Sequence, residues 1–369
     1  MANKSKRTST RPAIKQEEIV ARLREKIVLG KFLPGARLPT RTQLEASFDV
    51  SSVTVQRALD ALTEDGFVNA RGSLGTFVAE YPPHLSRYGL VFSAYPTESN
   101  WTRFWTALSN EAVAIGNTQS RRAAVYYHVQ CHPDEEAYVQ LLQDVAACRL
   151  AGLILPFDPA ALTGLMQSAV FGPGSPPKVA IVAGKAKPDV PTVRLNVKSF
   201  IDRGLDWLQS RGRQKVAVLS TPAMPLEFRD YFVQAVAQRN MRSEPAWMQA
   251  VSLEGLGWAH NVMQLLMAAT HPPDSLIITD DNLVEAATAG LVAAGIRVPE
   301  QLDVVAHCNF PWPTPSVLPA QRLGFDARVV MQTCLECIDA QRRGETVPAV
   351  QYITALFEHE THETLEQQS

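Results

Sequence analysis

The most informative part of the chain lies between residues 34 and 78. It contains Pro34-Gly35-Ala36-Arg37-Leu38-Pro39-Thr40-Arg41-Thr42-Gln43-Leu44, then Val50-Ser51-Ser52-Val53-Thr54-Val55-Gln56-Arg57-Ala58-Leu59, Gly66-Phe67-Val68 and Gly72-Ser73-Leu74-Gly75-Thr76-Phe77-Val78. Thr40 and Gln43 form a capping-box pattern, which predicts a helix from about Thr40, and Ser51 is a good N-cap for the next helix. Asp49 lies where the chain must turn between them. The stretch predicts two helices at an angle, followed by a glycine-tipped β-hairpin.

The second of these helices separates apolar from polar side chains. Its expected core face, at helical spacing, consists of Val55, Ala58, Leu59 and Leu62. On the opposite face, Gln56 can pair with adenine through two hydrogen bonds and Val53 can meet a thymine methyl group. The residues expected at a DNA duplex are Arg41, Thr42, Ser51, Ser52, Val53, Thr54, Gln56 and Arg57 from the helices, and Arg71, Gly72 and Ser73 from the hairpin tip. An ordinary helical hairpin is the alternative, but it would not bring cap, turn, polar face and glycine-rich tip together.

This segment resembles the winged helix-turn-helix of the GntR family of bacterial regulators over about residues 15–80. The matching motifs are Leu33-x-Gly35-x-x-Leu38-Pro39, Val50-Ser51-x-x-Thr54-Val55-x-x-Ala58-Leu59-x-x-Leu62, Gly66-Phe67-Val68 and Gly75-Thr76-Phe77-Val78. The resemblance implies binding to a double-stranded DNA operator. Thr42, Ser52 and Gln56 stand where the family often has arginine. Fewer arginines mean less guanine reading, so we expect a shifted or more A·T-containing half-site.

Charge separates this segment from the rest of the chain. Residues 1–80 have a net charge of +4 and the remainder has −6, within a chain of 369 residues with a net charge of −2. A basic end on an acidic body fits a small polyanion-binding module attached to a larger domain. No apolar run reaches the roughly 18 residues of a membrane span, and no apolar segment follows the basic N-terminus. We therefore expect a cytoplasmic protein with no membrane partner.

Motifs for metal binding and catalysis are weak. Cys334-x-x-Cys337 lies in an apolar helical pattern without the second pair that a zinc site needs, which predicts two buried cysteines. His359-x-x-His362 lacks the His-Glu-x-x-His order of zinc proteases, and no Gly-x-Ser-x-Gly elbow occurs. We expect no metal, no cofactor and no catalytic residue, and five sparse cysteines that stay reduced.

After a linker at residues 80–87, short apolar runs alternate with amphipathic segments. The runs expected to be strands are residues 89–92, 123–127, 152–155, 179–182, 215–219, 275–279, 304–306 and 352–357. Such alternation is typical of parallel sheets covered on both faces, so the fold class is α/β overall, with an N-terminal winged helix-turn-helix and a two-lobed α/β ligand-binding domain. The expected domains are a basic flexible arm at 1–13, the winged helix-turn-helix at 14–79, the linker, a two-lobed effector and dimerisation domain at 88–358 and a tail at 359–369.

Polar and aromatic residues follow several of these predicted strands. Ligands bind beyond the carboxyl ends of the strands in open parallel sheets, and this mixture suits a polar small molecule such as a sugar. The candidate ligand-binding residues are Trp101, Phe104, Asp158, Arg229, Asp281, Asn309, Phe325 and Asp326. Two alternatives stay open: the aromatic residues pack at a helix start, and Asp280 or Asp281 caps the helix before Leu283, with one aspartate for each job.

The larger segment resembles the LacI-type effector domain, which has the type I periplasmic-binding-protein fold. The motifs are Arg213-Gln214-Lys215-Val216-Ala217-Val218-Leu219, Arg229, Pro273-Asp274-Ser275-Leu276-Ile277-Ile278-Thr279-Asp280-Asp281, Ala287-x-x-Gly290-Leu291-x-x-Ala294-Gly295-Ile296-x-Val298-Pro299 and Leu302-Asp303-Val304-Val305. The resemblance implies that Asp281 binds sugar hydroxyls and that Arg229 contacts the ligand. Departures at Asn196 and at His307-Cys308-Asn309-Phe310 leave the identity of the ligand open.

Together the two resemblances imply a ligand-responsive transcription regulator, by frequency a repressor, that binds its operator as a homodimer. One alternative is a DNA-binding head on an enzyme that uses pyridoxal phosphate, which would need an anchoring lysine at a strand end. The lysines of the large domain lie at predicted strand starts or in loops. The other alternative is a DNA-binding dimer whose ligand cleft is vestigial. The sequence leaves open whether the ligand releases or promotes DNA binding.

Overall fold

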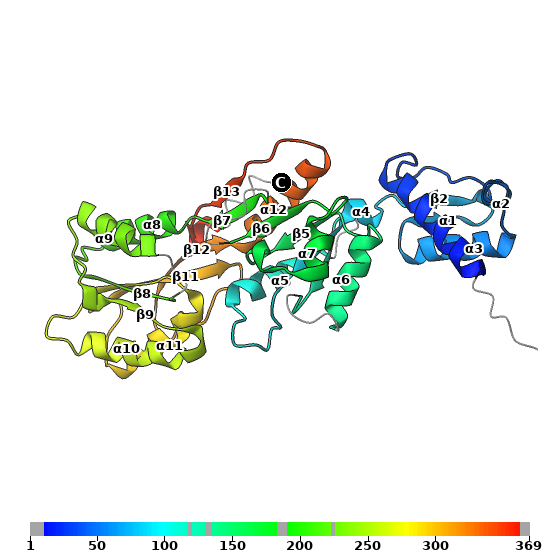
Figure 1. Ribbon diagram of the computed structural model, residues 1–369. Helices are drawn as coiled ribbons and strands as arrows, with labels where there is room; N and C mark the ends of the chain where they lie inside the picture. The colour runs from blue at the N-terminus through cyan, green and yellow to red at the C-terminus, as the bar shows by residue number, and fades with distance from the viewer. Residues whose placement is uncertain (1–10, 117–119, 130–134, 183–189, 223–225, 362–369) are drawn as a thin grey trace, which may run out of the picture. The chain divides into compact units, whose positions relative to one another are not determined.

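The computed structural model of the chain describes residues 11–116, 120–129, 135–182, 190–222 and 226–361 (Figure 1). The chain divides into two compact units. The first consists of Met1–Leu90, Ile115–Leu153 and Leu162–Lys178, and the second of Val91–Ala114, Ile154–Ala161 and Val179–Ser369. Most of the predicted arm at 1–13 and most of the predicted tail at 359–369 lie outside the described residues.

The N-terminal segment folds into three helices and a hairpin, as the sequence predicts. Its elements are α1 (Arg11–Val28), α2 (Arg41–Phe48), α3 (Ser52–Glu64), β1 (Val68–Ala70), a 3-10 turn η1 (Gly72–Leu74) and β2 (Thr76–Val78), which lie together at the blue end of Figure 1. The two strands pair antiparallel. Buried side chains from all three helices and the hairpin form one apolar core, which includes Ile19, Leu23, Leu44, Val55, Ala58, Leu62, Phe67 and Val78.

The predicted helix caps form as expected. The Thr40 side chain accepts a hydrogen bond from the Gln43 backbone, and the Gln43 side chain accepts one from the Thr40 backbone at 2.8 Å. Asp49 ends α2 in the left-handed conformation at φ 50°, so an aspartate makes the turn that often uses glycine. Ser51 then caps α3 by accepting from the backbone N–H of Thr54. These local bonds set the angle between the two helices.

Two six-stranded sheets form the rest of the described fold, with strand orders β13-β7-β6-β5-β3-β4 and β14-β12-β11-β10-β8-β9. The first sheet contains β3 (Arg87–Val91), β4 (Arg122–Tyr126), β5 (Gly152–Leu155), β6 (Lys178–Ile181), β7 (Thr192–Leu195) and β13 (Val350–Ile353). The second contains β8 (Val216–Ser220), β9 (Met248–Ala250), β10 (Ser275–Ile278), β11 (Asp303–Phe310), β12 (Gln321–Asp326) and β14 (Leu356–Phe357). Parallel pairing joins β9, β8, β10, β11 and β12, which confirms the predicted parallel α/β architecture.

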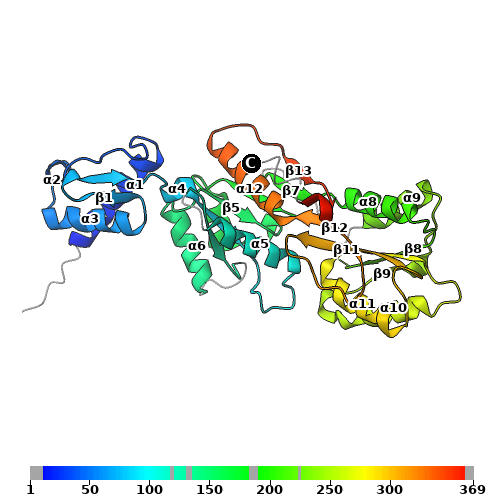
Figure 2. The same cartoon turned by 180° about the vertical axis from the view of Figure 1, so that it is seen from behind.

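Helices cover both faces of the second sheet. Figures 1 and 2 show α8 (Val197–Ser210) and α9 (Leu226–Gln238) on one face, and α10 (Gly257–Met267) and α11 (Val284–Ala293) on the other. Buried apolar side chains of α10 and α11 pack against those of β8, β10 and β11. The remaining helices are α4 (Pro83–Ser86), α5 (Arg103–Ile115), α6 (Glu136–Ala146), α7 (Gly164–Phe171) and α12 (Ala327–Arg342).

Several boundaries differ from the expected strands. The run 352–357 was expected to be one strand, but it divides into β13 and β14, which lie in different sheets because the chain crosses over at Thr354–Ala355. The strands β7, β9 and β12 were missed, since each mixes polar or charged residues with its apolar ones. The predicted linker at 80–87 contains the short helix α4, with Pro83 and Ser86 buried.

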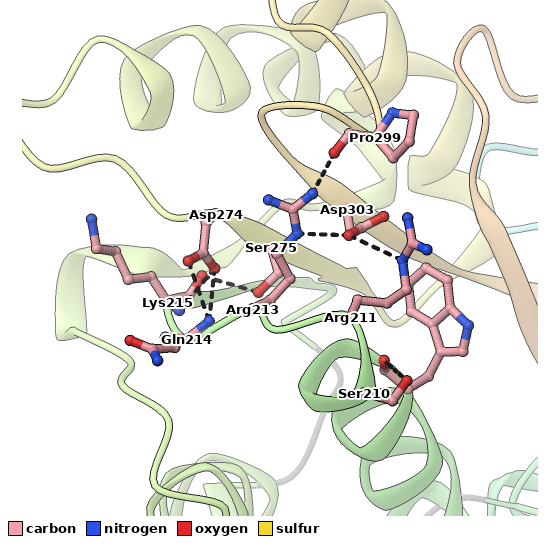
Figure 3. Close-up of polar contacts among 10 residues, drawn as sticks. Ser210, Arg211, Arg213, Gln214, Lys215, Asp274, Ser275, Pro299 and Asp303 are labelled. Atoms are coloured by element: carbon pink, nitrogen blue, oxygen red, sulfur yellow. Dashed lines mark hydrogen bonds and ion pairs between the residues drawn. The ribbon is translucent and has the colours of Figure 1, made fainter.

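Ion pairs tie together the amino ends of β8, β10 and β11 (Figure 3). The Arg213 Nε atom lies 2.6 Å from Asp303 Oδ2, and its guanidinium also donates to the Pro299 carbonyl. Asp274 accepts hydrogen bonds from the backbone N–H groups of Gln214 and Lys215. Much of the motif that carries the LacI resemblance therefore supports the sheet at the edge opposite the carboxyl ends of the strands.

Candidate nucleic-acid interface and ligand site

The exposed face of α3 has the composition that the sequence predicts. Val53 is 60% exposed, and Ser52 and Arg57 are also exposed, whereas Val55 and Ala58 on the other side have no exposed surface. The Thr54 hydroxyl lies 3.0 Å from that of Ser51, at the N-terminal end of the helix. A large apolar side chain held in water between polar neighbours is available to contact a base methyl group in a major groove.

Gln56 has an intramolecular partner within this face. Its Nε2 atom donates to Asp60 Oδ1 at 2.6 Å, one helical turn further along α3. Its Oε1 atom is buried and has no hydrogen-bond partner among the described residues. Two hydrogen bonds to adenine require both the amide N–H and the amide oxygen, so the side chain must leave Asp60 before it can read a base in this way.

The hairpin presents arginines beside glycines with unusual backbone angles. The Arg71 guanidinium stacks over the Phe77 ring at 4.8 Å, while Gly72 and Gly75 have φ values of 55° and 105°. A Cβ atom on Gly75 would lie 3.0 Å from Arg37 Nε, so any other residue there would require the Arg37 side chain to shift. Sequence reasoning did not select Arg37, although its position two residues after Gly35 was a usable signal.

The start of α2 lies on the surface of the same domain. Arg41 and Thr42 are both exposed there. They follow the Thr40 cap directly, where the unpaired backbone N–H groups of a helix end attract an anion. The structure therefore places exposed polar residues at the starts of α2 and α3 and at the hairpin tip, as the predicted DNA contact requires.

At the carboxyl ends of β10 and β11, polar side chains surround the buried carboxylate of Asp281. Asp281 is 2% exposed, and its Oδ2 atom accepts a hydrogen bond from Asn309 Nδ2 at 2.6 Å and from Thr314 Oγ1 at 3.3 Å. The Nδ1 atom of His307 lies 3.9 Å from Asp281 Oδ1. We call Asp281, His307, Asn309 and Thr314 the aspartate cluster; sequence reasoning did not select His307 or Thr314.

The buried groups of the aspartate cluster are incompletely compensated, so they can accept further hydrogen bonds or donate them to a ligand. Burial and the charge of Asp280 raise the pKa of Asp281, and the proximity of His307, the hydrogen bond from Asn309 and the charge of Arg103 offset only part of that rise. His307 Nδ1 and Asn309 Oδ1 are buried without a hydrogen-bond partner among the described residues. Buried polar atoms are normally paired, so this cluster has unused capacity to bind the hydroxyl or N–H groups of a ligand.

The two adjacent aspartates have the separate structural positions that one alternative anticipated. Asp280 caps the 3-10 turn that leads into α11: its carboxylate accepts from the Asn282 backbone at 2.9 Å and from Asn282 Nδ2 at 2.7 Å. Asp281 makes no such cap and points its carboxylate to Asn309 and Thr314. Asp281 is thus the one of the pair that is available to the cluster.

The predicted aromatic residues gather at the start of α5. The ring centroid of Trp101 lies 4.8 Å from that of Phe92 and 5.4 Å from that of Trp105, and Phe104 is half-buried in the same turn. Arg103, which sequence reasoning did not select, lies against the turn that contains the aspartates. Its backbone N–H donates to Asn282 Oδ1, and its guanidinium pairs with Glu285, both at 3.1 Å. The aromatic group and the aspartate cluster therefore belong to one neighbourhood.

Asp326 and Phe325 have structural partners at the end of β12. Asp326 has no exposed surface, caps α12 and pairs with Arg328, while Phe325 packs between Phe200 and His307. Glu111 of α5 accepts a hydrogen bond from Trp312 Nε1 at 2.8 Å, and burial raises the pKa of Glu111. Sequence reasoning missed Glu111 because a glutamate in the middle of an amphipathic helix is normally solvated.

Two predicted ligand residues make no hydrogen bond or ion pair with Asp281 among the described residues. Asp158 is exposed, and its carboxylate accepts from the backbone N–H of Ala160. Arg229 is exposed on α9.

The described residues contain neither a metal-binding group of side chains nor a membrane-spanning helix. No group of three or more His, Cys, Asp or Glu side chains there has the arrangement to hold a metal ion. Within the same residues, no helix is both long enough and apolar enough to span a bilayer. Cys334 and Cys337 are buried in α12, as predicted, and burial raises the pKa of both thiols.

Comparison with protein families identifies both parts of the chain. Residues 15–78 match the bacterial regulatory proteins of the gntR family, and residues 205–354 match the periplasmic binding protein-like domain. The chain therefore joins a GntR-type helix-turn-helix domain to a periplasmic-binding-protein-like domain. The second match rules out the aminotransferase-like enzyme that was one alternative for the large domain.

Curated relatives match a short part of the chain. The chain is 41% identical over 63 residues to the mannosyl-D-glycerate transport/metabolism system repressor MngR of Escherichia coli (strain K12), and 39% identical over 69 residues to the histidine utilization repressor of Klebsiella aerogenes. These alignments cover 17% and 19% of the chain, and 26% and 29% of the two repressors. The chain thus spans less than a third of the length of these relatives.

Solved structures share the fold of the larger part. A LacI family transcriptional regulator from Bifidobacterium animalis subsp. lactis DSM 10140 superimposes with a TM-score of 0.57 at 16% identity, covering 75% of this chain and 96% of that chain. The transcriptional regulator CelR in complex with cellobiose gives a TM-score of 0.56 at 16% identity, covering 84% and 90%. At this identity the likeness establishes the fold and leaves the ligand open.

Proposed function

Because the chain joins a GntR-type DNA-binding domain to a periplasmic-binding-protein-like domain, we propose that it is a transcriptional repressor controlled by a small polar ligand. The observation that carries the proposal is the combination of two features in one chain. The first is the exposed face of α3, built on a packed core. The second is the aspartate cluster at the carboxyl ends of two parallel strands. The first suits a major groove and the second suits a hydrogen-bonding small molecule.

The DNA contact that we propose uses α3 for bases and the helix ends for phosphates. Ser52, Val53, Gln56 and Arg57 read the major groove, Arg41 and Thr42 bind the backbone, and Arg71 follows the adjacent groove from the hairpin. Two copies of the chain pair and place two heads on a two-fold-related operator in the cytoplasm. The repressor role follows the two repressors that share this domain.

The ligand that we propose is polyhydroxylated, and a sugar fits best. Asp281 and Asn309 supply hydrogen-bond acceptors, His307 supplies a ring nitrogen, and Trp101 and Phe104 supply aromatic faces against which a sugar ring can stack. The fold likeness to CelR, whose complex contains cellobiose, supports the same class. Asp158, Arg229, Phe325 and Asp326 remain secondary candidates, which contact the ligand only after the residues around the cleft rearrange.

The ligand controls DNA binding only if it binds two arrangements of the protein with different affinities. A shift from 1% to 99% of one state needs a difference of about 5.5 kcal/mol, or roughly four orders of magnitude in affinity. A buried, partly unsatisfied cluster suits this requirement, because hydrogen bonds that form only when the cleft closes around the ligand favour one arrangement.

Two measurements test the proposal. Fluorescence anisotropy with duplexes selected from a randomised pool measures DNA binding, and the Arg57→Ala variant should weaken it while Arg22→Ala, an exposed arginine paired with Glu18 on α1, should not. Thermal-shift screening against sugars, nucleosides and amino acids finds the ligand class, because a molecule that binds only the folded state raises the midpoint. If the protein selects no preferred sequence from the pool, the proposal that it is a transcription regulator is refuted. Sequence-dependent DNA binding with no thermal shift from any compound would instead favour the dimer with a vestigial cleft.

A further inference from the structure

Arg149 bridges two aspartates that lie far apart in sequence. Its Nη2 atom is 2.7 Å from Asp65 Oδ1, and its Nη1 atom is 3.1 Å from Asp144 Oδ1. Asp65 is the residue that ends α3, the proposed DNA-reading helix, whereas Asp144 lies in α6 beside the first sheet. All three residues belong to the first compact unit. One guanidinium therefore connects the DNA-binding domain with a helix of the ligand-binding domain.

Both oxygens of Asp65 are used. Oδ2 accepts from Arg24 Nη2 of α1 at 2.6 Å, and Oδ1 faces Arg149. The Asp65 side chain is 13% exposed and that of Arg24 is 16% exposed, so water screens these pairs weakly. Asp65 thus holds the end of α3 to α1 through one oxygen and to Arg149 through the other.

The other end of the bridge is a preformed anchor. Asp144 has no exposed surface and accepts hydrogen bonds from Tyr126 Oη at 2.5 Å and Gln140 Nε2 at 3.1 Å, while Arg87 lies 3.2 Å away. Burial alone would raise the pKa of Asp144, but these hydrogen bonds and charges outweigh burial and hold the pKa below its usual value. Asp144 stays ionised and fixes Arg149 independently of the DNA-binding domain.

The segment between the two domains is also folded. His84 of α4 stacks on Phe67, with ring centroids 5.7 Å apart, and Arg122 donates to the carbonyl of Tyr81 at 3.3 Å. A cavity of about 630 Å³ lies beside the bridge, lined by Glu17, Arg24, Asp65, Arg87, Asp144 and Arg149 among others. The ion pairs thus border a polar cavity.

We propose that Arg149 is a positioning residue, which docks the DNA-binding domain on the ligand-binding domain through Asp65 and so fixes the direction of α3. In a dimer, two fixed heads match only one spacing of half-sites, whereas released heads tolerate several. The spacing consequence rests on the proposed function, while docking itself does not. A movement of α6 that shifts Arg149 would release the head.

The test compares Arg149→Met with the control Arg239→Met. Arg239, directly after α9, also pairs with two aspartates, Asp202 and Asp206, but both of these lie on α8. DNA affinity is measured for a single half-site, for two half-sites at the spacing that the wild-type protein selects, and for two half-sites moved apart by about 5 base pairs, half a helical turn. Wild type and Arg239→Met should lose about tenfold or more at the altered spacing, whereas Arg149→Met should lose less than about threefold and keep its half-site affinity.

A second readout requires no DNA. A glutamate-specific endoproteinase cuts after exposed Glu80, between the domains, and mass spectrometry identifies the product. Cleavage should be several times faster in Arg149→Met than in wild type and Arg239→Met. Asp65→Asn breaks the same bridge but leaves the Asp144 anchor intact, and it should show the same acceleration. It therefore tests the docking role even if Arg149→Met misfolds.

The outcomes separate the two proposals. Equal cleavage rates in all variants, or an unchanged spacing preference in Arg149→Met, would overturn the docking role. An absence of sequence-dependent binding by the wild-type protein would overturn the proposed function, and the cleavage rates would then decide the docking role alone.

Discussion

Replacing Asp281 by asparagine separates the cost of burying a carboxylate from its use in binding. The substitution keeps the shape, and the remaining carbonyl oxygen can still accept from Asn309 and Thr314. It removes a buried charge whose pKa is raised chiefly by desolvation. Each unit of such a shift is worth about 1.4 kcal/mol. We therefore expect Asp281→Asn to unfold at higher denaturant concentration than wild type at pH 7, and to lose the thermal shift produced by the ligand.

The pH dependence of this gain follows from the direction of the shift. A carboxyl with a raised pKa in the folded state binds its proton more tightly there than in the unfolded chain, so its contribution favours folding at low pH. That contribution is lost as the pH rises from 3.8, the ordinary pKa of an aspartate, through the folded-state pKa. The stability difference between Asp281→Asn and wild type should therefore grow across this window and stay constant above it.

The matched control is Asp280→Asn, one residue earlier. Asn and Asp cap helices about equally well, so this variant should stay within about 0.5 kcal/mol of wild type at pH 7. Urea unfolding between pH 4.5 and 8 measures both variants. If Asp281→Asn proves less stable than wild type at pH 7, the charge–dipole bonds in the aspartate cluster outweigh desolvation, and the reasoning above is wrong.

Three further substitutions test other parts of the structure. Arg57→Ala should weaken binding to a selected duplex by about 1–3 kcal/mol, measured by anisotropy, and an equal loss with Arg22→Ala would instead indicate a general charge effect. Arg213→Met should lower the free energy of unfolding by about 3 kcal/mol in urea while the ligand affinity stays unchanged, because it leaves buried Asp303 with Arg211 at 3.6 Å. Gly75→Ala should cost about 1–3 kcal/mol in the DNA-binding domain and weaken DNA binding, because φ is 105° and the new Cβ crowds Arg37; hydrogen exchange of β1 and β2 would show no change if the hairpin absorbs the strain.

The fold of the N-terminal domain was predictable because its signals are local. Thr40, Gln43 and Ser51 act on neighbours within a few residues, and the observed caps are those that their side chains favour. The alternating pattern of the larger part also predicted parallel sheets. It did not reveal that residues 352–357 serve two sheets, since a short apolar run has the same appearance whether it continues or crosses over.

The candidate ligand site was predictable only where chemistry and strand ends coincide. Asp281 follows a buried strand and Asn309 lies at the carboxyl end of the neighbouring one, and the structure joins them by a hydrogen bond. His307 and Glu111 were missed because each lies within an element whose pattern predicts ordinary packing or solvation. The Asp65–Arg149 bridge was beyond sequence reasoning, because no local pattern pairs residues 84 positions apart.

The hydrogen bond between Gln56 and Asp60 competes with base recognition by α3, the proposed DNA-reading helix. In free protein the carboxylate of Asp60 occupies the amide group that a base would use, and its negative charge disfavours nearby phosphates. An adenine can bind both the N–H and the oxygen of the Gln56 amide. A base that offers only one matching group leaves a buried donor or acceptor without a partner at the interface. If α3 reads adenine through Gln56 as proposed, this competition lowers the affinity for every sequence and lowers it more for mismatched sequences.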